Sequence, residues 1–339
     1  MDARIDKVKS DIFSVKYWLI GFLILVLVMI AVGGATRLTR SGLSITEWRP
    51  ISGFIPPMSE FDWKVEFDKY KKTPEYRELN NHFEINDFKS IFLWEYTHRS
   101  IGRIPFLYAL LPGLYFWRRG KISVQTPVFF SSYITFQGFV GWLMVKSGLS
   151  KVPAVSPFHL AFHYFLALGL LIFIFRELCQ FRTKLNVNST QLTSFLTKTI
   201  GVALGVQIFY GCLMSGYKAG YLSDTFPMIN GKLLPTSVFS SSFAIINLVE
   251  LPFLINWVHR WLGLLTVILV SIHVYLILKS VAGKDRRPYI HFWGVTTSQI
   301  FLGVALVKFH IPILVAISHQ IIAALIVLAY FNIVFRAKT

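Results

Sequence analysis

The chain has 339 residues, of which 54% are hydrophobic and only 15% are charged. So few charged residues cannot cover the surface of a soluble protein of this length, and the composition excludes an ordinary soluble domain in favour of an integral membrane protein. The formal net charge of +17 makes a nucleic-acid partner a hypothesis that the distribution of the charge can test.

Apolar runs as long as a membrane-spanning helix, about 20 residues, occur eight times along the chain. The predicted spans cover residues 17–35, 91–117, 123–145, 155–175, 195–215, 253–278, 289–307 and 311–335. They leave two long loops, 36–90 and 216–252. We therefore expect an all-α integral membrane protein with eight transmembrane helices.

Basic residues concentrate on one side of these spans. With a cytoplasmic amino terminus, the inner segments are the tails 1–16 and 336–339, the linker 176–194, and two short loops at 118–122 and 279–288. All are rich in Lys and Arg, whereas each long loop on the opposite side carries equal numbers of acidic and basic residues. This positive-inside pattern accounts for the charge without nucleic acid and predicts that both termini are cytoplasmic.

The amino-terminal tail also bears on the kind of membrane. It contains Asp2, Asp6 and Asp11, whereas mitochondrial transit peptides are poor in acidic residues. We therefore expect the inner membrane of a bacterium rather than that of a mitochondrion.

The two halves of the chain, 17–175 and 195–335, share polar residues and glycines at offsets of 160 to 162 positions. The matches are His98, Arg99 and Gly102 with His259, Arg260 and Gly263, the segment 137–146 with 299–308, and His159 with His319. Chance similarity between apolar helices would fall on aliphatic residues instead. The pattern predicts two tandem four-helix bundles, related by a pseudo-twofold axis along the membrane normal.

The four matched histidines are candidate haem ligands, because each lies near the outer end of an even-numbered predicted span. They are His98 and His159 in the first half, and His259 and His319 in the second. Two opposed imidazoles in a helix bundle typically hold a haem iron. His163, one turn after His159, is an alternative ligand, although at these offsets its counterpart is Ala323. A zinc site would need more ligands than either half offers.

Glycines and arginines beside these histidines also suit a haem. Gly102 and Gly263 each lie four residues after a histidine, on the same helical face, where a flat macrocycle can approach closely. Arg99 and Arg260 lie at the outer membrane boundary, where they can pair with haem propionates.

Glu95 is the one acidic residue within a predicted span. A carboxylate at that depth costs about 2.5 kcal/mol or more, which makes a functional role the first hypothesis. It shares a helical face with His98, and its counterpart in the second half is Asn256, which cannot ionise. We therefore expect proton transfer in the first half and electron transfer alone in the second. An ion pair with Arg99 or Arg103 is an alternative, compatible role.

Five stretches of the chain resemble the haem A synthase family, most closely its alphaproteobacterial and mitochondrial form. They are GGATRLTRSGLSITEWRPISGFIPP (33–57), EYTHRSIGR (95–103), HLAFHY (159–164), NWVHRWLG (256–263) and SHQ (318–320). Some family members carry a cysteine pair in the first outer loop, and the loop 36–90 of this sequence contains none. A thiol-based electron step is therefore not expected.

The resemblance implies oxidation of the C8 methyl group of haem O to a formyl group by two successive hydroxylations, which yields haem A for cytochrome c oxidase. It implies a permanent haem b ligated by His259 and His319 in the second half. It also implies that substrate haem O binds through His98 and His159, with Glu95 as the acid/base residue. Haem O synthase and cytochrome c oxidase assembly components are the implied partners, together with membrane lipid.

Two other functions would use the same residues. A di-haem cytochrome b would carry electrons through the four histidines, but electron carriage does not need an unpaired acid such as Glu95. A duplicated proton-coupled transporter would use histidines and Glu95 as a proton relay and would bind no haem.

Overall fold

The structure is a computed structural model that describes residues 2–150, 152–187, 190–234 and 244–337. Parts of four predicted segments lie outside these residues: position 1 of the first tail, 188–189 of the linker, 235–243 of the second long loop, and 338–339 of the last tail. The chain divides into two compact units, Met1–Ile174 and Phe175–Thr339.

Helices dominate the described residues, and β-structure there is limited to two isolated bridges. Seven helices are long and apolar enough to cross a membrane. They are α1 (Asp2–Leu38), α6 (Gln125–Gly148), α7 (Pro157–Cys179), α8 (Gln191–Gly216), α10 (Pro252–Ser280), α11 (Arg287–Lys308) and α12 (Ile313–Arg336). They coincide with seven of the eight predicted spans, and they confirm an all-helical protein with several apolar spans.

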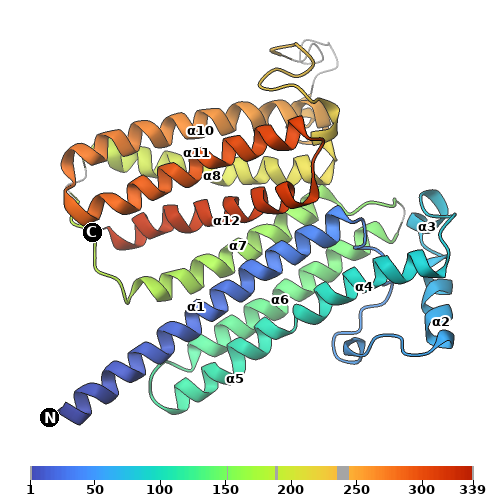
Figure 1. The fold of residues 1–339 in the computed structure, drawn as a ribbon, viewed down its shortest axis with the longest axis horizontal. Helices are drawn as coiled ribbons and strands as arrows, with labels where there is room; N and C mark the ends of the chain where they lie inside the picture. The colour runs from blue at the N-terminus through green and yellow to red at the C-terminus, as the bar shows by residue number, and fades with distance from the viewer. Residues whose placement is uncertain (1, 151, 188–189, 235–243, 338–339) are drawn as a thin grey trace. The chain divides into compact units, whose positions relative to one another are not determined.

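The second predicted span, 91–117, is not one helix. The structure divides it into α4 (Ile85–Ile101) and α5 (Ile104–Arg118), with a break at Gly102 and Arg103 (Figure 1). Pro105 has no backbone N–H to continue the helical hydrogen bonds, and glycine is a weak helix former. The prediction of a continuous second helix is therefore corrected to two helices that follow one another.

In the first unit, α1 packs on α4 and α5, and α5 packs on α6. The indole N–H of Trp18 in α1 donates to the backbone carbonyl of Tyr108 in α5 at 3.0 Å. Helix α6 contacts α7 where the hydroxyl of Tyr133 donates to the carbonyl of Leu166 at 2.9 Å. Gly169 makes room for that phenol, since any side chain there would meet its oxygen.

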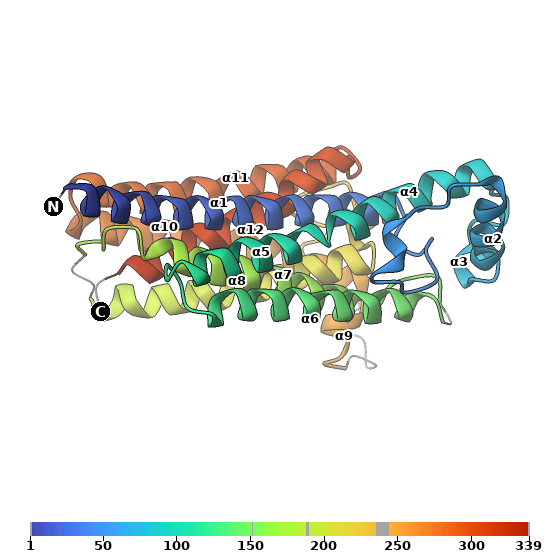
Figure 2. The same cartoon turned by 90° about the horizontal axis from the view of Figure 1, so that it is seen from below.

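In the second unit, four helices close a ring: α8 contacts α10, α10 contacts α11, α11 contacts α12, and α12 contacts α8. Figures 1 and 2 show these helices running side by side. Their buried core includes Ile200, Val274, Phe292 and Ile333. Two short helices, η2 (Ala219–Leu222) and α9 (Asn247–Glu250), lie in the second long loop. The apolar core therefore fills the end of the unit opposite that loop.

The first long loop is a folded structure of its own. It contains η1 (Ser52–Phe54), α2 (Glu60–Tyr70) and α3 (Pro74–Glu78), and α2 and α3 lie near the beginning of α4 (Figure 1). Phe67 and Tyr70 of α2 stack on Phe88 of α4, with ring centroids 5.1 and 5.2 Å apart. This aromatic cluster fixes the outer end of α4, which begins at Ile85 rather than at residue 91.

Replacement of Phe88 by alanine should loosen the first long loop. Phe88 is fully buried, and removal of a core aromatic ring costs about 3–5 kcal/mol. We expect faster cleavage of the loop by protease added to sealed vesicles that expose it. Leu79→Ala, at a position with 46% exposure, should be cleaved at the wild-type rate. Equal cleavage of both variants would contradict the assigned core.

Candidate functional site

Four histidines share one packing arrangement, in which the imidazole lies against a glycine of a neighbouring helix. A Cβ atom built on each glycine would lie 3.0 to 3.5 Å from a ring atom of the histidine. The pairs are Gly33 with His98, Gly141 with His163, Gly211 with His259, and Gly303 with His319. In three pairs, at 3.0 to 3.2 Å, a methyl group would crowd the ring, whereas at Gly303 it would just touch the ring of His319.

A glutamine stands four residues before three of these glycines. Gln137, Gln207 and Gln299 each donate a side-chain N–H to the backbone carbonyl of the facing histidine, at 2.9 to 3.0 Å. In apolar surroundings such a hydrogen bond is strong, and it ties two helices together at the level of the imidazole. The equivalent position before Gly33 is occupied by Met29, whose side chain has no N–H to donate.

Each unit brings two of these histidines together. His163 lies within electrostatic range of His98, and His319 lies within range of His259. The Nδ1 atoms of His163 and His319 are buried and have no hydrogen-bond partner among the described residues. Each unit therefore offers two imidazoles, one of which keeps an unbonded ring nitrogen.

The histidine of α7 in this arrangement is His163, and not His159. His159 is exposed, whereas His163 is partly buried against α6. His163 and His319 are each the seventh residue of their helix. The match of His159 with His319, predicted from a nearly constant offset, is therefore corrected to a match of His163 with His319.

The physical reason for this correction is a longer connection in the first unit. Gly148 ends α6 and Pro157 begins α7, whereas Lys308 ends α11 and Ile313 already begins α12. An offset that aligns α6 with α11 therefore places α7 out of register with α12. Proline at the first position of a helix is a known start signal, and Pro157 could have revealed the shift.

Glu95 is almost completely buried, with 2% of its surface exposed. Its carboxylate accepts hydrogen bonds from the Ser44 hydroxyl and the Ile45 backbone N–H, both at 2.8 Å. It also accepts one from Arg99 at 2.6 Å, so the predicted ion pair is present. The carboxylate lies within electrostatic range of His98. Glu95 therefore joins the first long loop to the helix that carries His98.

Asn256 holds the second long loop in a related way. It is fully buried, and its side-chain N–H donates to the backbone carbonyl of Ala219 at 2.7 Å. Glu95 accepts from a loop N–H, whereas Asn256 donates to a loop carbonyl. Both units therefore fix a loop at this position, but only the first does so with an ionisable group.

The two predicted propionate partners are also bonded to the loops. Arg99 donates to the carbonyls of Ile45 and Glu47, both at 3.0 Å. Arg260 donates to the carbonyls of Thr225 and Met228. Only 6% of Arg260 is exposed, its Nε is unbonded, and it has no carboxylate partner among the described residues. A buried cation without a counter-ion suits an anionic ligand, so the propionate contact of Arg260 stays a prediction with physical support.

Gly102 and Gly263, predicted to make room for a macrocycle, each lie beside a side chain of a neighbouring helix. A Cβ atom on Gly102 would lie 3.4 Å from the methyl carbon of Met29, and one on Gly263 would lie 3.0 Å from the amide nitrogen of Gln207. Met29 and Gln207 occupy equivalent positions, each four residues before the glycine that contacts a histidine. Gly102 and Gly263 therefore have equivalent neighbours in the two units. Their contact with a macrocycle stays a prediction.

Ion pairs extend the loop contacts from Arg99 to α2. Lys69 of α2 lies 3.1 Å from a carboxylate oxygen of Glu47 and 2.9 Å from one of Glu66. The hydrogen bond from Lys69 lowers the pKa of the Glu47 carboxyl group. The backbone that receives the Arg99 guanidinium is thus anchored to the folded part of the loop.

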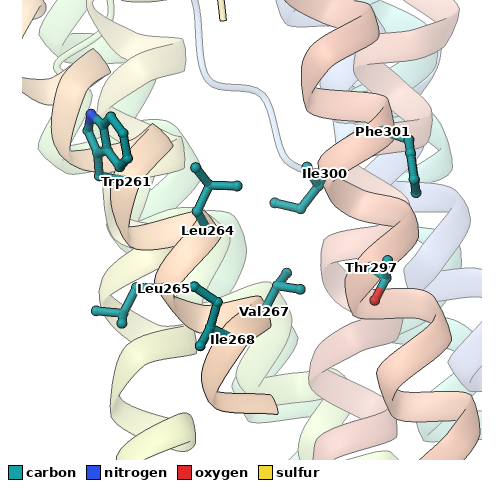
Figure 3. A pocket seen from close by; sticks show the side chains of 8 residues that line it. All are labelled: Trp261, Leu264, Leu265, Val267, Ile268, Thr297, Ile300 and Phe301. Atoms are coloured by element: carbon teal, nitrogen blue, oxygen red, sulfur yellow. The ribbon is translucent and has the colours of Figure 1, made fainter. Parts of the chain in front are cut away.

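A cavity of about 490 Å³ lies between α10 and α11 (Figure 3). Its lining is almost entirely apolar: Trp261, Leu264, Leu265, Val267, Ile268, Thr297, Ile300 and Phe301. This volume is within the range of pockets for small ligands. None of the paired histidines lines it, although Trp261 lies only two residues after His259.

The donors in each unit fit a haem better than a bare metal ion. Two imidazoles, glycines that leave room beside them, and an arginine nearby are the groups that bind a haem iron and its carboxylates. Among the described residues there is no group of three or more His, Cys, Asp or Glu side chains suited to a metal ion. Two-ligand coordination of a haem iron remains compatible with this result.

Comparison with known proteins places the chain in a family. The model of COX15-CtaA, cytochrome oxidase assembly protein, matches residues 16–331. A protein named heme A synthase from Wolbachia pipientis wMel is 38% identical over 316 residues, which are 91% of this chain and 88% of the relative. One from Neorickettsia sennetsu is 38% identical over 317 residues, covering 91% and 95% of the two chains. One from Brucella anthropi is 34% identical over 335 residues, covering 97% and 93%. The chain therefore belongs to the COX15-CtaA family of cytochrome oxidase assembly proteins.

Proposed function

We propose that this protein is a haem A synthase, which oxidises the C8 methyl group of haem O to a formyl group. The observation that carries the proposal is the packing of two histidines against glycines in each unit, with the buried, ionisable Glu95 in one unit at the position where the other has Asn256. The matches to relatives named heme A synthase extend over most of both chains, which supports the same activity for this protein. Haem A formed in this way would serve cytochrome c oxidase.

The proposed membrane arrangement has eight transmembrane segments in two related bundles. The second segment is the pair α4 and α5, and the other seven are the apolar helices. The basic inner segments favour cytoplasmic termini, and the acidic residues of the amino-terminal tail favour a bacterial inner membrane. The four glycine–histidine pairs support the relation between the bundles, since they occur in the same order in each unit.

In the second unit, His259 and His319 would hold a permanent haem b. When bound, haem b supplies one-electron transfer. The chain holds these imidazoles with two amide hydrogen bonds, from Gln207 to the carbonyl of His259 and from Gln299 to that of His319. Arg260, which is buried and has no counter-ion within the described part of the chain, would bind a propionate of the same haem. A site fixed in this way suits a cofactor that stays in place.

In the first unit, His98 and His163 would bind the substrate haem O. His163 thus replaces His159 as the proposed second ligand. Gln137 holds the carbonyl of His163. At the corresponding position the helix that faces His98 has Met29, so no glutamine among the described residues bonds the carbonyl of His98 as Gln137, Gln207 and Gln299 bond those of the other three histidines. We infer that His98 is the more easily displaced ligand, as binding of substrate and release of product require.

Glu95 would hold or move a proton next to the substrate. Its carboxylate lies within electrostatic range of His98, and the donors Ser44, Ile45 and Arg99 fix its position. A positioned carboxylate of this kind contributes to catalysis by general acid/base action. Haem O synthase and assembly components of cytochrome c oxidase are the proposed partners, since they would supply the substrate and receive the product.

The choice between the two histidines of α7 can be tested by substitution. His163→Ala should abolish conversion of haem O to haem A, because it removes an imidazole from the pair. His159→Ala should retain conversion, because that side chain is exposed. Pigment extraction and chromatography after expression with haem O synthase measure both. The opposite pattern would restore His159 as the ligand.

The glycines beside the histidines allow a matched test in one helix. Gly211→Val should abolish the haem b absorbance of the purified protein, because its Cβ would lie 3.2 Å from the His259 ring. Gly205→Val, also in α8, should keep the absorbance, because no atom lies within 4 Å of a Cβ at that position. Retention of haem b by both variants would argue against binding between these helices.

The Glu95→Gln variant tests the function itself. It should retain haem b and lose haem A formation, because an amide keeps the shape of the side chain but cannot transfer a proton at neutral pH. Glu78→Gln, an exposed position in the first long loop, should behave as wild type. Haem A formation by Glu95→Gln at the wild-type rate would remove the proposed proton role. A wild-type protein that holds haem b but never forms haem A would instead be a di-haem electron carrier.

A further inference from the structure

The segment between residues 48 and 61 exposes a run of large apolar side chains outside the predicted spans. The exposed fractions are 47% for Trp48, 88% for Ile51, 61% for Phe54, 72% for Ile55, 78% for Met58 and 73% for Phe61. Scattered apolar residues are normal on a surface, but a contiguous apolar patch marks a place of contact with another phase or molecule. The depth of the segment relative to the membrane decides whether these side chains contact lipid or another protein.

Trp48 provides one measure of depth. Its ring stacks on Trp142 of α6, with the ring centroids 5.2 Å apart. Trp142 lies six residues before the end of α6 at Gly148, which is about 9 Å along the helix axis. Trp48 therefore lies alongside an apolar spanning helix, below its outer end.

Arg103 provides a second, independent measure. Its guanidinium donates to the carbonyl oxygens of Arg49 and Pro50 at 3.1 and 2.9 Å. Arg103 lies fifteen residues before Arg118, the last residue of α5, which corresponds to about 22 Å of helix. A hydrocarbon core is about 30 Å thick, so Arg103 holds the segment at or below the outer boundary of the bilayer.

We propose that the segment from Trp48 to Phe61 inserts its apolar side chains into the outer leaflet of the membrane. Trp48 begins it at the level where aromatic residues typically meet the lipid head groups. Phe61 is the second residue of α2, and the charged remainder of this helix returns the chain to water. The partner is bilayer lipid, because the contacts of Trp48 and Arg103 place the segment at the depth of lipid rather than of a soluble protein. The inference does not rest on the proposed enzymatic function.

This insertion would link the membrane surface to the candidate site. Residues 44–47 directly precede the segment, and their backbone and side chains hold Glu95 and Arg99.

Spin labels at single cysteines test the insertion in the full-length protein in lipid vesicles. The native Cys179 and Cys212 are buried and would be replaced by alanine. Labels at Ile51→Cys and Ile55→Cys should collide more with oxygen than with a water-soluble nickel chelate, like a label at Leu111→Cys on the exposed face of α5. Both positions are highly exposed, so their substitution removes little packing.

The matched control is Asp68→Cys in α2, at a side chain with 67% exposure, where the nickel chelate should collide more often than oxygen. Labels at 51 and 55 that respond like the control would place the segment in water and overturn the proposal. Labels that neither reagent reaches would also overturn it, because they would show that protein covers the segment. Normal haem content of the labelled variants would show that the fold is intact.

Discussion

The close approach of an imidazole to a glycine on a neighbouring helix is the contact on which both units depend. It lets each pair of helices approach closely at the level of the imidazole. In an apolar environment, small residues are what allow such close helix contacts. Gln137, Gln207 and Gln299 add a hydrogen bond at the same level. The ligands proposed for haem are therefore fixed by ordinary helix packing.

The two units use this shared frame for unequal chemistry. Glu95 and Asn256 occupy equivalent positions and both secure a long loop, but the carboxylate accepts hydrogen bonds and the amide donates one. Met29 in place of a glutamine adds a second difference beside His98. The two units thus share their glycine–histidine packing and differ in whether the residue that secures the loop can ionise.

Much of the fold follows from hydropathy, because each of seven spans is long and apolar and has no proline beyond its first turn. The sequence Gly102-Arg103-Ile104-Pro105 escaped that reasoning, since hydropathy does not record a missing backbone N–H. His163 escaped because a constant offset ignores a difference in loop length. The folded first long loop could not be predicted either, since its core joins Phe67 and Tyr70 to Phe88, which lie far along the chain. The histidines, Glu95 and the arginines were visible because polar groups in apolar runs are costly.

The interruption between α4 and α5 has a mechanical consequence. The helix that bears Glu95 and His98 is joined to the rest of its span where backbone hydrogen bonds are already missing. Fewer backbone hydrogen bonds would have to break for this helix to change its angle at the joint than in a continuous helix. Its counterpart α10 is continuous from Pro252 to Ser280, so bending it would break hydrogen bonds along a rigid rod. The helix that bears Glu95 and His98 is therefore easier to bend than α10.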